Sequence, residues 1–169
     1  MDKKLIKKYL TGFMMVLLLV LLDQFTKYLA CTKLADGPVV LIPGVFEFRY
    51  ITNNGAAWGM LGGQQTFFII LTSVMLLVML YIYVKTPVTK RYYPVLITDV
   101  LLFSGAVGNF IDRLVNNYVH DFLYFSLIDF PVFNVADCYI TVSAVLIFVL
   151  VLFYYKDDDF EFLKLGRKK

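Results

Sequence analysis

The sequence predicts an all-α membrane protein with four transmembrane helices and a small extracytoplasmic β platform. The first observation is composition: 60% of the 169 residues are hydrophobic, 17% are charged, and the mean hydropathy is +0.72. Soluble domains of this size are much less apolar. The second observation is a set of four apolar windows, each long enough to cross a ~30 Å hydrocarbon core as a helix of ~20 residues. These windows are residues 9–30, 66–84, 92–111 and 132–155.

The distribution of basic residues predicts how these helices are oriented. Twelve of the 16 Lys and Arg residues fall in the N-terminal segment, in the connection between the second and third windows, and in the charged tail 156–169. The remaining four are Lys27, Lys33, Arg49 and Arg113. Because segments rich in Lys and Arg stay in the cytoplasm, both termini are expected to be cytoplasmic. This topology accounts for the net charge of +3, so we expect no nucleic-acid partner.

We expect one polytopic domain over residues 1–169, whose two longer connections lie outside the cytoplasm. In the first of them, "FEFRY" (46–50) alternates aromatic and charged residues with the period of a strand. The turn signals "IPG" and "NNG" flank it. The sequence therefore predicts a β platform at about 39–57, with its aromatic face on the membrane surface.

Polar side chains gather at the outer ends of the predicted helices. The members of this group are Asp23 and Lys27 in the first helix, Asn54 before the second, Asn109, Asp112 and Arg113 ending the third, Asp121 in the second outer connection, and Asn134 and Asp137 starting the fourth. Within each helix, spacings of three or four residues put these side chains on one face. Ionisable groups in membrane segments cost about 2.5–3.5 kcal/mol on insertion scales, so each is a candidate functional residue.

Alternatively, these polar residues stabilise the helix ends and have no role in function. Asp23 with Lys27, and Asp112 with Arg113, are then ion pairs that hold helix ends, and Asn134 is an N-cap. Asp99, nearer the cytoplasmic side of the third helix, is expected to pair with Arg91 or Lys90, or to face another polar neighbour.

Asp121 and Asp137, in adjacent segments of the chain, are the candidates for a catalytic pair, although spacing alone does not show that they meet. Two carboxyl groups held close in a site of low dielectric constant share a proton, because both cannot ionise readily. Such a pair supplies a base for a water molecule and an acid for a carbonyl oxygen, which is how aspartic peptidases cleave amides without a metal.

Five motifs occur in order along the chain and together resemble the lipoprotein signal peptidases, also called prolipoprotein signal peptidases or signal peptidase II. They are "DQFTK" (23–27), "NNGAAWG" (53–59), "GAVGNFIDR" (105–113), "VHDF" (119–122) and "FNVADCYI" (133–140). The resemblance covers the whole chain apart from the charged tail.

The resemblance implies a bacterial aspartic endopeptidase, multi-pass in the cytoplasmic membrane, with its active site towards the outer leaflet. It would remove signal peptides from prolipoproteins, cutting before a cysteine that carries a diacylglyceryl group. The resemblance assigns catalysis to Asp121 and Asp137. It assigns support of the site or of the substrate to Asn54, Asn109, Arg113, Asn134, Asp23 and Lys27. Membrane lipids and globomycin-type inhibitors are further implied partners, and no cofactor or metal is implied.

Three other functions compete with this assignment. A zinc site at His120, Asp121, Asp137 and Asp23 has only one histidine and no ligand-spaced motif. A small transporter would need polar residues near the bilayer centre and internal repeats. A non-catalytic lipoprotein-binding membrane protein would keep its function when either aspartate is replaced by asparagine, whereas an enzyme would lose it.

Overall fold

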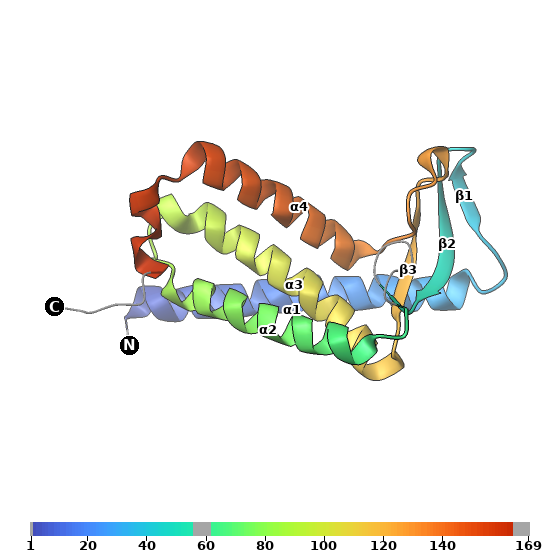
Figure 1. Ribbon diagram of the computed structural model, residues 1–169, viewed down its shortest axis with the longest axis horizontal. Coiled ribbons are helices and arrows are strands. Elements are labelled where there is room, and N and C mark those ends of the chain that lie inside the picture. The colour runs from blue at the N-terminus through green and yellow to red at the C-terminus, as the bar shows by residue number, and fades with distance from the viewer. Residues whose placement is uncertain (1, 56–61, 164–169) are drawn as a thin grey trace.

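The computed structural model describes residues 2–55 and 62–163 and has four long helices (Figure 1). They are α1 (Lys3–Lys33), α2 (Gln65–Lys85), α3 (Tyr93–Asn116) and α4 (Val135–Val149). A 3-10 turn, Lys90–Tyr92, leads into α3, and a π-helical turn, Leu150–Tyr154, extends α4. With these extensions, all four are long and apolar enough to cross a membrane, as the apolar windows predict.

Large apolar side chains cover the outside of this bundle. Phe13 of α1 is 64% exposed, Leu77 of α2 is 67% exposed and Phe153 after α4 is 79% exposed. An apolar surface of this extent is unfavourable in water but is what a hydrocarbon environment requires. The chain is therefore a multi-pass membrane protein.

Helix α3 is the central helix of the bundle, and small residues let its neighbours approach it closely. A Cβ atom added to Gly105 would lie 2.5 Å from the carbonyl oxygen of Ala136 in α4. A Cβ atom added to Gly108 would clash with the carboxylate of Asp23 in α1 and lie 3.3 Å from the Cβ of Ala136. Glycine at these two positions therefore allows α1, α3 and α4 to meet near one end of the bundle.

A three-stranded antiparallel sheet stands at the end of the bundle where α1 ends (Figure 1). Its strands are β1 (Val39–Ile42), β2 (Phe46–Asn53) and β3 (Val119–Tyr124), in the order β1-β2-β3. The first two strands fall in the predicted platform, whose last two residues lie outside the described part of the chain. The third strand was not predicted, and it comes from the connection between α3 and α4.

The aromatic face of β2 packs on other aromatic side chains. The ring of Phe46 lies 4.9 Å from that of Phe125, and the ring of Phe48 lies 6.4 Å from that of Phe122 in β3. Glu47, on the other face, forms an ion pair with Arg49. The alternation of the "FEFRY" stretch therefore separates an aromatic face from a charged one, as expected for a strand.

At the opposite end of the bundle, Asp99 has the second of its two expected environments, a polar neighbour. Arg91 forms an ion pair with Asp159 at 2.7 Å, and its guanidinium lies over the ring of Tyr154. Its contacts are therefore with the segment after α4. Asp99 is buried and instead interacts electrostatically with Lys8 of α1. Partners on a neighbouring helix were not visible from spacing within α3.

Candidate active site

The two predicted catalytic aspartates lie on two elements, β3 and the start of α4, that meet at the end of the bundle where the sheet stands. Asp121 is in β3, where it is 1% exposed, and Asp137 is in the first turn of α4. Asn134 is the N-cap of α4: its Oδ1 accepts a hydrogen bond from the backbone N of Asp137 at 3.0 Å. The backbone N of Asn134 donates to Oδ2 of Asp137 at 3.1 Å. This reciprocal capping box fixes the position of the Asp137 carboxylate.

Asparagine amides link the two carboxylates. The Nδ2 of Asn134 donates to Oδ1 of Asp121 at 2.7 Å and to Oδ1 of Asn109 at 3.1 Å. The Nδ2 of Asn109 in turn donates to Oδ1 of Asp137 at 2.8 Å. A continuous chain of hydrogen bonds therefore joins residues from α3, β3 and α4, and two of the three predicted asparagines, Asn109 and Asn134, are part of it.

The third asparagine of the site is Asn53 rather than the predicted Asn54. The Nδ2 of Asn53, the last residue of β2, donates to Oδ2 of Asp121 at 2.9 Å. Asn54 is exposed, and its carbonyl oxygen accepts hydrogen bonds from Gly63 and Gln65. Adjacent residues of an extended strand point to opposite faces, so a shift of one position moves the side chain out of the site.

A buried ion network from α1 supports these asparagines. Nζ of Lys27 lies 2.9 Å from Oδ2 of Asp23 and 3.0 Å from Oδ2 of Asp112. It also donates to Oδ1 of Asn109 at 2.9 Å. Oδ1 of Asp23 accepts from the backbone N of Ala136, at the start of α4. The predicted pair Asp23 and Lys27 is therefore confirmed, while Asp112 pairs with Lys27 instead of its neighbour Arg113.

One member of this network, Gln24, was not predicted from the sequence. Gln24 donates from Nε2 to Oδ1 of Asp112 at 3.0 Å and to the carbonyl oxygen of Gly108 at 3.1 Å. Asp112 also accepts from the backbone N of His120 at 3.1 Å, which ties the end of α3 to β3. Gln24 lies inside the "DQFTK" motif, so its position next to Asp23 was the available signal.

Arg113 lies beside the aspartates and has a buried N–H group that is available to bind a ligand. Its guanidinium lies over the ring of Phe68 at 5.0 Å, and Nη1 reaches the carbonyl oxygen of Asn109 at 3.5 Å. Its Nε is buried and has no hydrogen-bond partner within residues 2–55 and 62–163. A buried donor of this kind is suited to a carbonyl oxygen of a bound molecule.

The aspartates open into a cavity of about 500 Å³. Its polar lining residues are Asn53, Asn109, Arg113, Asp121, Asp137, Cys138 and Thr141, and its apolar lining residues include Val119, Phe125, Phe130, Pro131, Val132, Phe133 and Val142. The cavity therefore has a small group of convergent polar side chains among apolar walls, as ligand sites commonly do. No group of three or more His, Cys, Asp or Glu side chains in the described ranges is arranged to hold a metal ion.

Burial and a neighbouring charge give Asp121 unusual acid–base behaviour. Burial, followed by the Asp137 carboxylate, raises the pKa of Asp121 to about 7. Hydrogen bonds from Asn53 and Asn134, and the charge of Lys27, act in the opposite direction. Asp121 is therefore able to exchange a proton at neutral pH, which an ordinary surface aspartate cannot do.

Both ring nitrogens of His120 contact residues other than Asp121. Its Nδ1 lies 2.7 Å from the hydroxyl of Tyr50, and its Nε2 lies 3.2 Å from Nδ2 of Asn116. Burial lowers the pKa of His120, so the ring favours its neutral form. His120 therefore connects strand β2, through Tyr50, with α3, through Asn116. It is not one of the residues that line the cavity.

Comparisons with known proteins agree with the geometry. Residues 15–153 match the model of the Signal peptidase (SPase) II family. Lipoprotein signal peptidases of Staphylococcus aureus strains JH9 and Newman are 38% identical over 151 residues, which cover 86% of this chain and 91% of theirs. A solved bacterial membrane enzyme is 33% identical with a TM-score of 0.75, covering 94% of each chain. A second one is 34% identical with a TM-score of 0.74, covering 86% of this chain and 94% of its own. The chain belongs to the signal peptidase II family.

Proposed function

We propose that this chain removes signal peptides from prolipoproteins and uses Asp121 and Asp137 as its acid and base. The observation that carries the proposal is the pair of carboxylates joined through Asn134 and opening into one cavity. Membership of a peptidase family gives the reaction class, and the cavity supplies the only two carboxyl groups among its lining residues in the described ranges.

The chemistry requires one aspartate ionised and the other protonated. The ionised carboxylate takes a proton from a water molecule, whose oxygen attacks the carbonyl carbon of the scissile peptide bond. The protonated carboxyl group donates its proton to the carbonyl oxygen. Collapse of the resulting tetrahedral diol breaks the C–N bond, with a proton delivered to the leaving nitrogen. The sum is the addition of one water molecule across one peptide bond.

The surroundings of the aspartates fit a membrane-bound peptide substrate. An extended peptide at this depth finds little water, so its carbonyl groups need protein donors. The unpartnered Nε of Arg113 and the amides of Asn53 and Asn109 line the same cavity. The apolar walls suit a hydrophobic signal sequence and the acyl chains of a diacylglyceryl-modified cysteine. We place the cut directly before that cysteine.

Orientation and inhibition follow from the same proposal. The excess of Lys and Arg at the end where α1 starts supports a topology with both termini in the cytoplasm and the aspartates near the outer leaflet of a bacterial cytoplasmic membrane. Globomycin-type cyclic peptides are then expected to compete with prolipoproteins for the cavity at Asp121 and Asp137.

Cleavage of a lipid-modified prolipoprotein tests the proposed substrate. Purified protein in detergent with EDTA is expected to release the signal peptide from diacylglyceryl-modified prolipoprotein, as resolved by gel shift and mass spectrometry. A prolipoprotein whose modified cysteine is replaced by serine is the matched control and should remain intact. Equal cleavage of both substrates would contradict lipid recognition, and failure on the modified substrate would contradict the proposed function.

The pH dependence of cleavage tests the role of Asp121. With the pKa of Asp121 at about 7, the pH–rate profile should have one limb with its midpoint near pH 7. The hydrogen bond from Asn53 lowers this pKa because it stabilises the ionised carboxylate. Asn53→Ala should therefore move that limb to higher pH, whereas Asn54→Ala should leave it in place. A limb that moves to lower pH in Asn53→Ala would contradict the assignment.

A further inference from the structure

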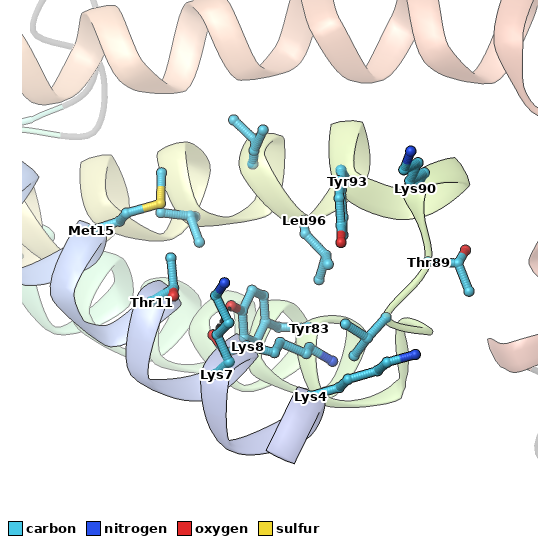
Figure 2. A pocket seen from close by; sticks show the side chains of 14 residues that line it. Lys4, Lys7, Lys8, Thr11, Met15, Tyr83, Thr89, Lys90, Tyr93 and Leu96 are labelled. Carbon is cyan, nitrogen blue, oxygen red and sulfur yellow. Dashed lines mark hydrogen bonds between the residues drawn. The ribbon is translucent and has the colours of Figure 1, made fainter. Parts of the chain in front are cut away.

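A second cavity lies at the opposite end of the bundle from the aspartates. It has a volume of about 740 Å³ and is lined by residues of α1, α2, α3 and the turn before α3 (Figure 2). Lys8 lines it, and Lys27 of the active-site network is 19 residues further along α1. At 1.5 Å per residue, the two sites are about 28 Å apart along the helix axis. The proposed peptidase chemistry does not use this cavity.

The lining of this cavity carries positive charge. Its lining includes Lys4, Lys7 and Lys8 of α1, and Lys90 of the turn before α3 (Figure 2). None of the described residues that line it is an aspartate or a glutamate. Lys8 also interacts with the buried Asp99 of α3, whereas the exposed Lys4, Lys7 and Lys90 give this end of the cavity a net positive charge that favours an anion.

Lys8 lines the cavity and is held in place by hydrogen bonds to the protein. It is 6% exposed, and its Nζ donates to the carbonyl oxygens of Val84 at 3.2 Å and Thr86 at 2.8 Å, where α2 ends. The hydroxyl of Tyr83 donates to the carbonyl oxygen of Lys8 at 2.9 Å. An ammonium group has three N–H donors, so two fixed acceptors leave one donor for a ligand.

The cavity changes from charged to apolar along its length. Lys4 and Lys90 lie near one end, whereas Met15 lies at the other end (Figure 2). Leu96, Ile97 and Val100 follow Lys90 along α3 and add to the apolar lining. Ile97 is 49% exposed, so this part is open to the apolar surface of the bundle. A ligand that fits this lining has an anionic head and a hydrocarbon tail.

We propose that this cavity binds one anionic phospholipid, with its phosphate among the lysines and an acyl chain along Met15, Leu96 and Val100. Basic pockets between transmembrane helices are suited to anionic lipid headgroups. A water-soluble phosphate would satisfy the lysines but would leave the apolar half of the cavity unfilled. The C-terminal residues 164–169 do not fit this cavity in place of a lipid, because their sequence "KLGRKK" is basic and the lysines of the cavity would repel it. The lipid belongs to the leaflet at the end of the bundle where α1 starts.

Lipid-dependent thermal stability tests this proposal without any peptidase assay. The purified full-length protein is unfolded by heating in a neutral detergent, with added dioleoyl phosphatidylglycerol or dioleoyl phosphatidylcholine. The anionic lipid is expected to raise the Tm by about 5 °C more than the zwitterionic lipid does, because it binds the folded state. Glycerol 3-phosphate at the same concentration should have no such effect, since it lacks the acyl chains.

The matched variants remove charge from exposed lysines only. Lys4→Gln, Lys7→Gln and Lys90→Gln combined should abolish the preference for the anionic lipid, and Lys90→Gln alone should reduce it if the triple variant does not fold. Lys33→Gln, at the other end of α1, should keep the full preference. Equal Tm shifts with both lipids in the wild type would overturn the proposal. So would an unchanged preference in the lysine variants, or an equal shift with glycerol 3-phosphate.

Discussion

Asp121→Asn and Asp137→Asn are each expected to abolish cleavage of a diacylglyceryl-modified prolipoprotein, with a loss of about 10³-fold or more. Each substitution keeps the size of the side chain and removes the carboxylic acid that accepts or donates a proton. One aspartate cannot perform both proton transfers, so the two single variants should be equally inactive and the double variant no worse. Initial rates of signal-peptide release by purified proteins in EDTA give the comparison.

Asp129→Asn is the matched control for these two variants. Asp129 accepts a hydrogen bond from the hydroxyl of Tyr124 at 2.5 Å and does not line the cavity, so this variant should retain activity near that of the wild type. The Tm in detergent shows whether each variant is folded. Folded Asp121→Asn or Asp137→Asn protein that still cleaves at the wild-type rate would exclude the proposed acid–base pair.

Cleavage by the wild type, together with substrate binding by the inactive variants, separates an enzyme from a non-catalytic binding protein. The asparagine amides and Arg113 remain in both variants, so modified prolipoprotein should still bind. An enzyme then binds without cutting, whereas a binding protein would never have released a signal peptide in the wild type. The same measurement distinguishes both from a transporter, which would have no specific affinity for the prolipoprotein.

The parts of the fold that follow from hydropathy and local spacing were predictable from the sequence. Each transmembrane helix needs a run of apolar residues, so the four windows were visible without any knowledge of packing. Asp23 and Lys27 are one turn apart on α1, and Asn134 and Asp137 are three residues apart at the start of α4. Helix geometry alone puts the members of each pair side by side.

The parts that depend on contacts between distant segments were not predictable in this way. Strand β3 exists because "VHDFLY" pairs with β2, about 70 residues earlier in the chain, where Ile51 faces Asp121. Asp112 was expected to pair with Arg113, but adjacent helical residues point in different directions, and Lys27 of α1 lies 3.0 Å from its carboxylate. Whether Asn53 or Asn54 points into the site likewise depends on strand register, and a turn signal in the sequence does not fix that register.

Lys27→Met is expected to cause the largest loss of stability of any substitution considered for this chain. Lys27 is 2% exposed, and it is the cation between the Asp23 and Asp112 carboxylates, which are 0% and 1% exposed. Removing one partner of a buried ion pair leaves an uncompensated buried charge, which typically costs about 3–5 kcal/mol. Here two carboxylates lose their partner, and Asn109 loses a donor at 2.9 Å. We expect a large drop in Tm or failure to fold in detergent.

Lys33→Met is the control, because Lys33 lies in the last turn of α1 and is exposed. A second variant separates charge from packing: Lys27→Met combined with Asp23→Asn and Asp112→Asn removes the cation and both anions together. The neutral combination should regain part of the lost Tm, because no unpaired charge remains buried and an asparagine at 23 still offers an oxygen to the backbone N of Ala136. If Lys27→Met unfolds at the same temperature as Lys33→Met, the network contributes no net stability. The network would then serve to orient Asn109 towards Asp137, and the loss would appear in the cleavage rate.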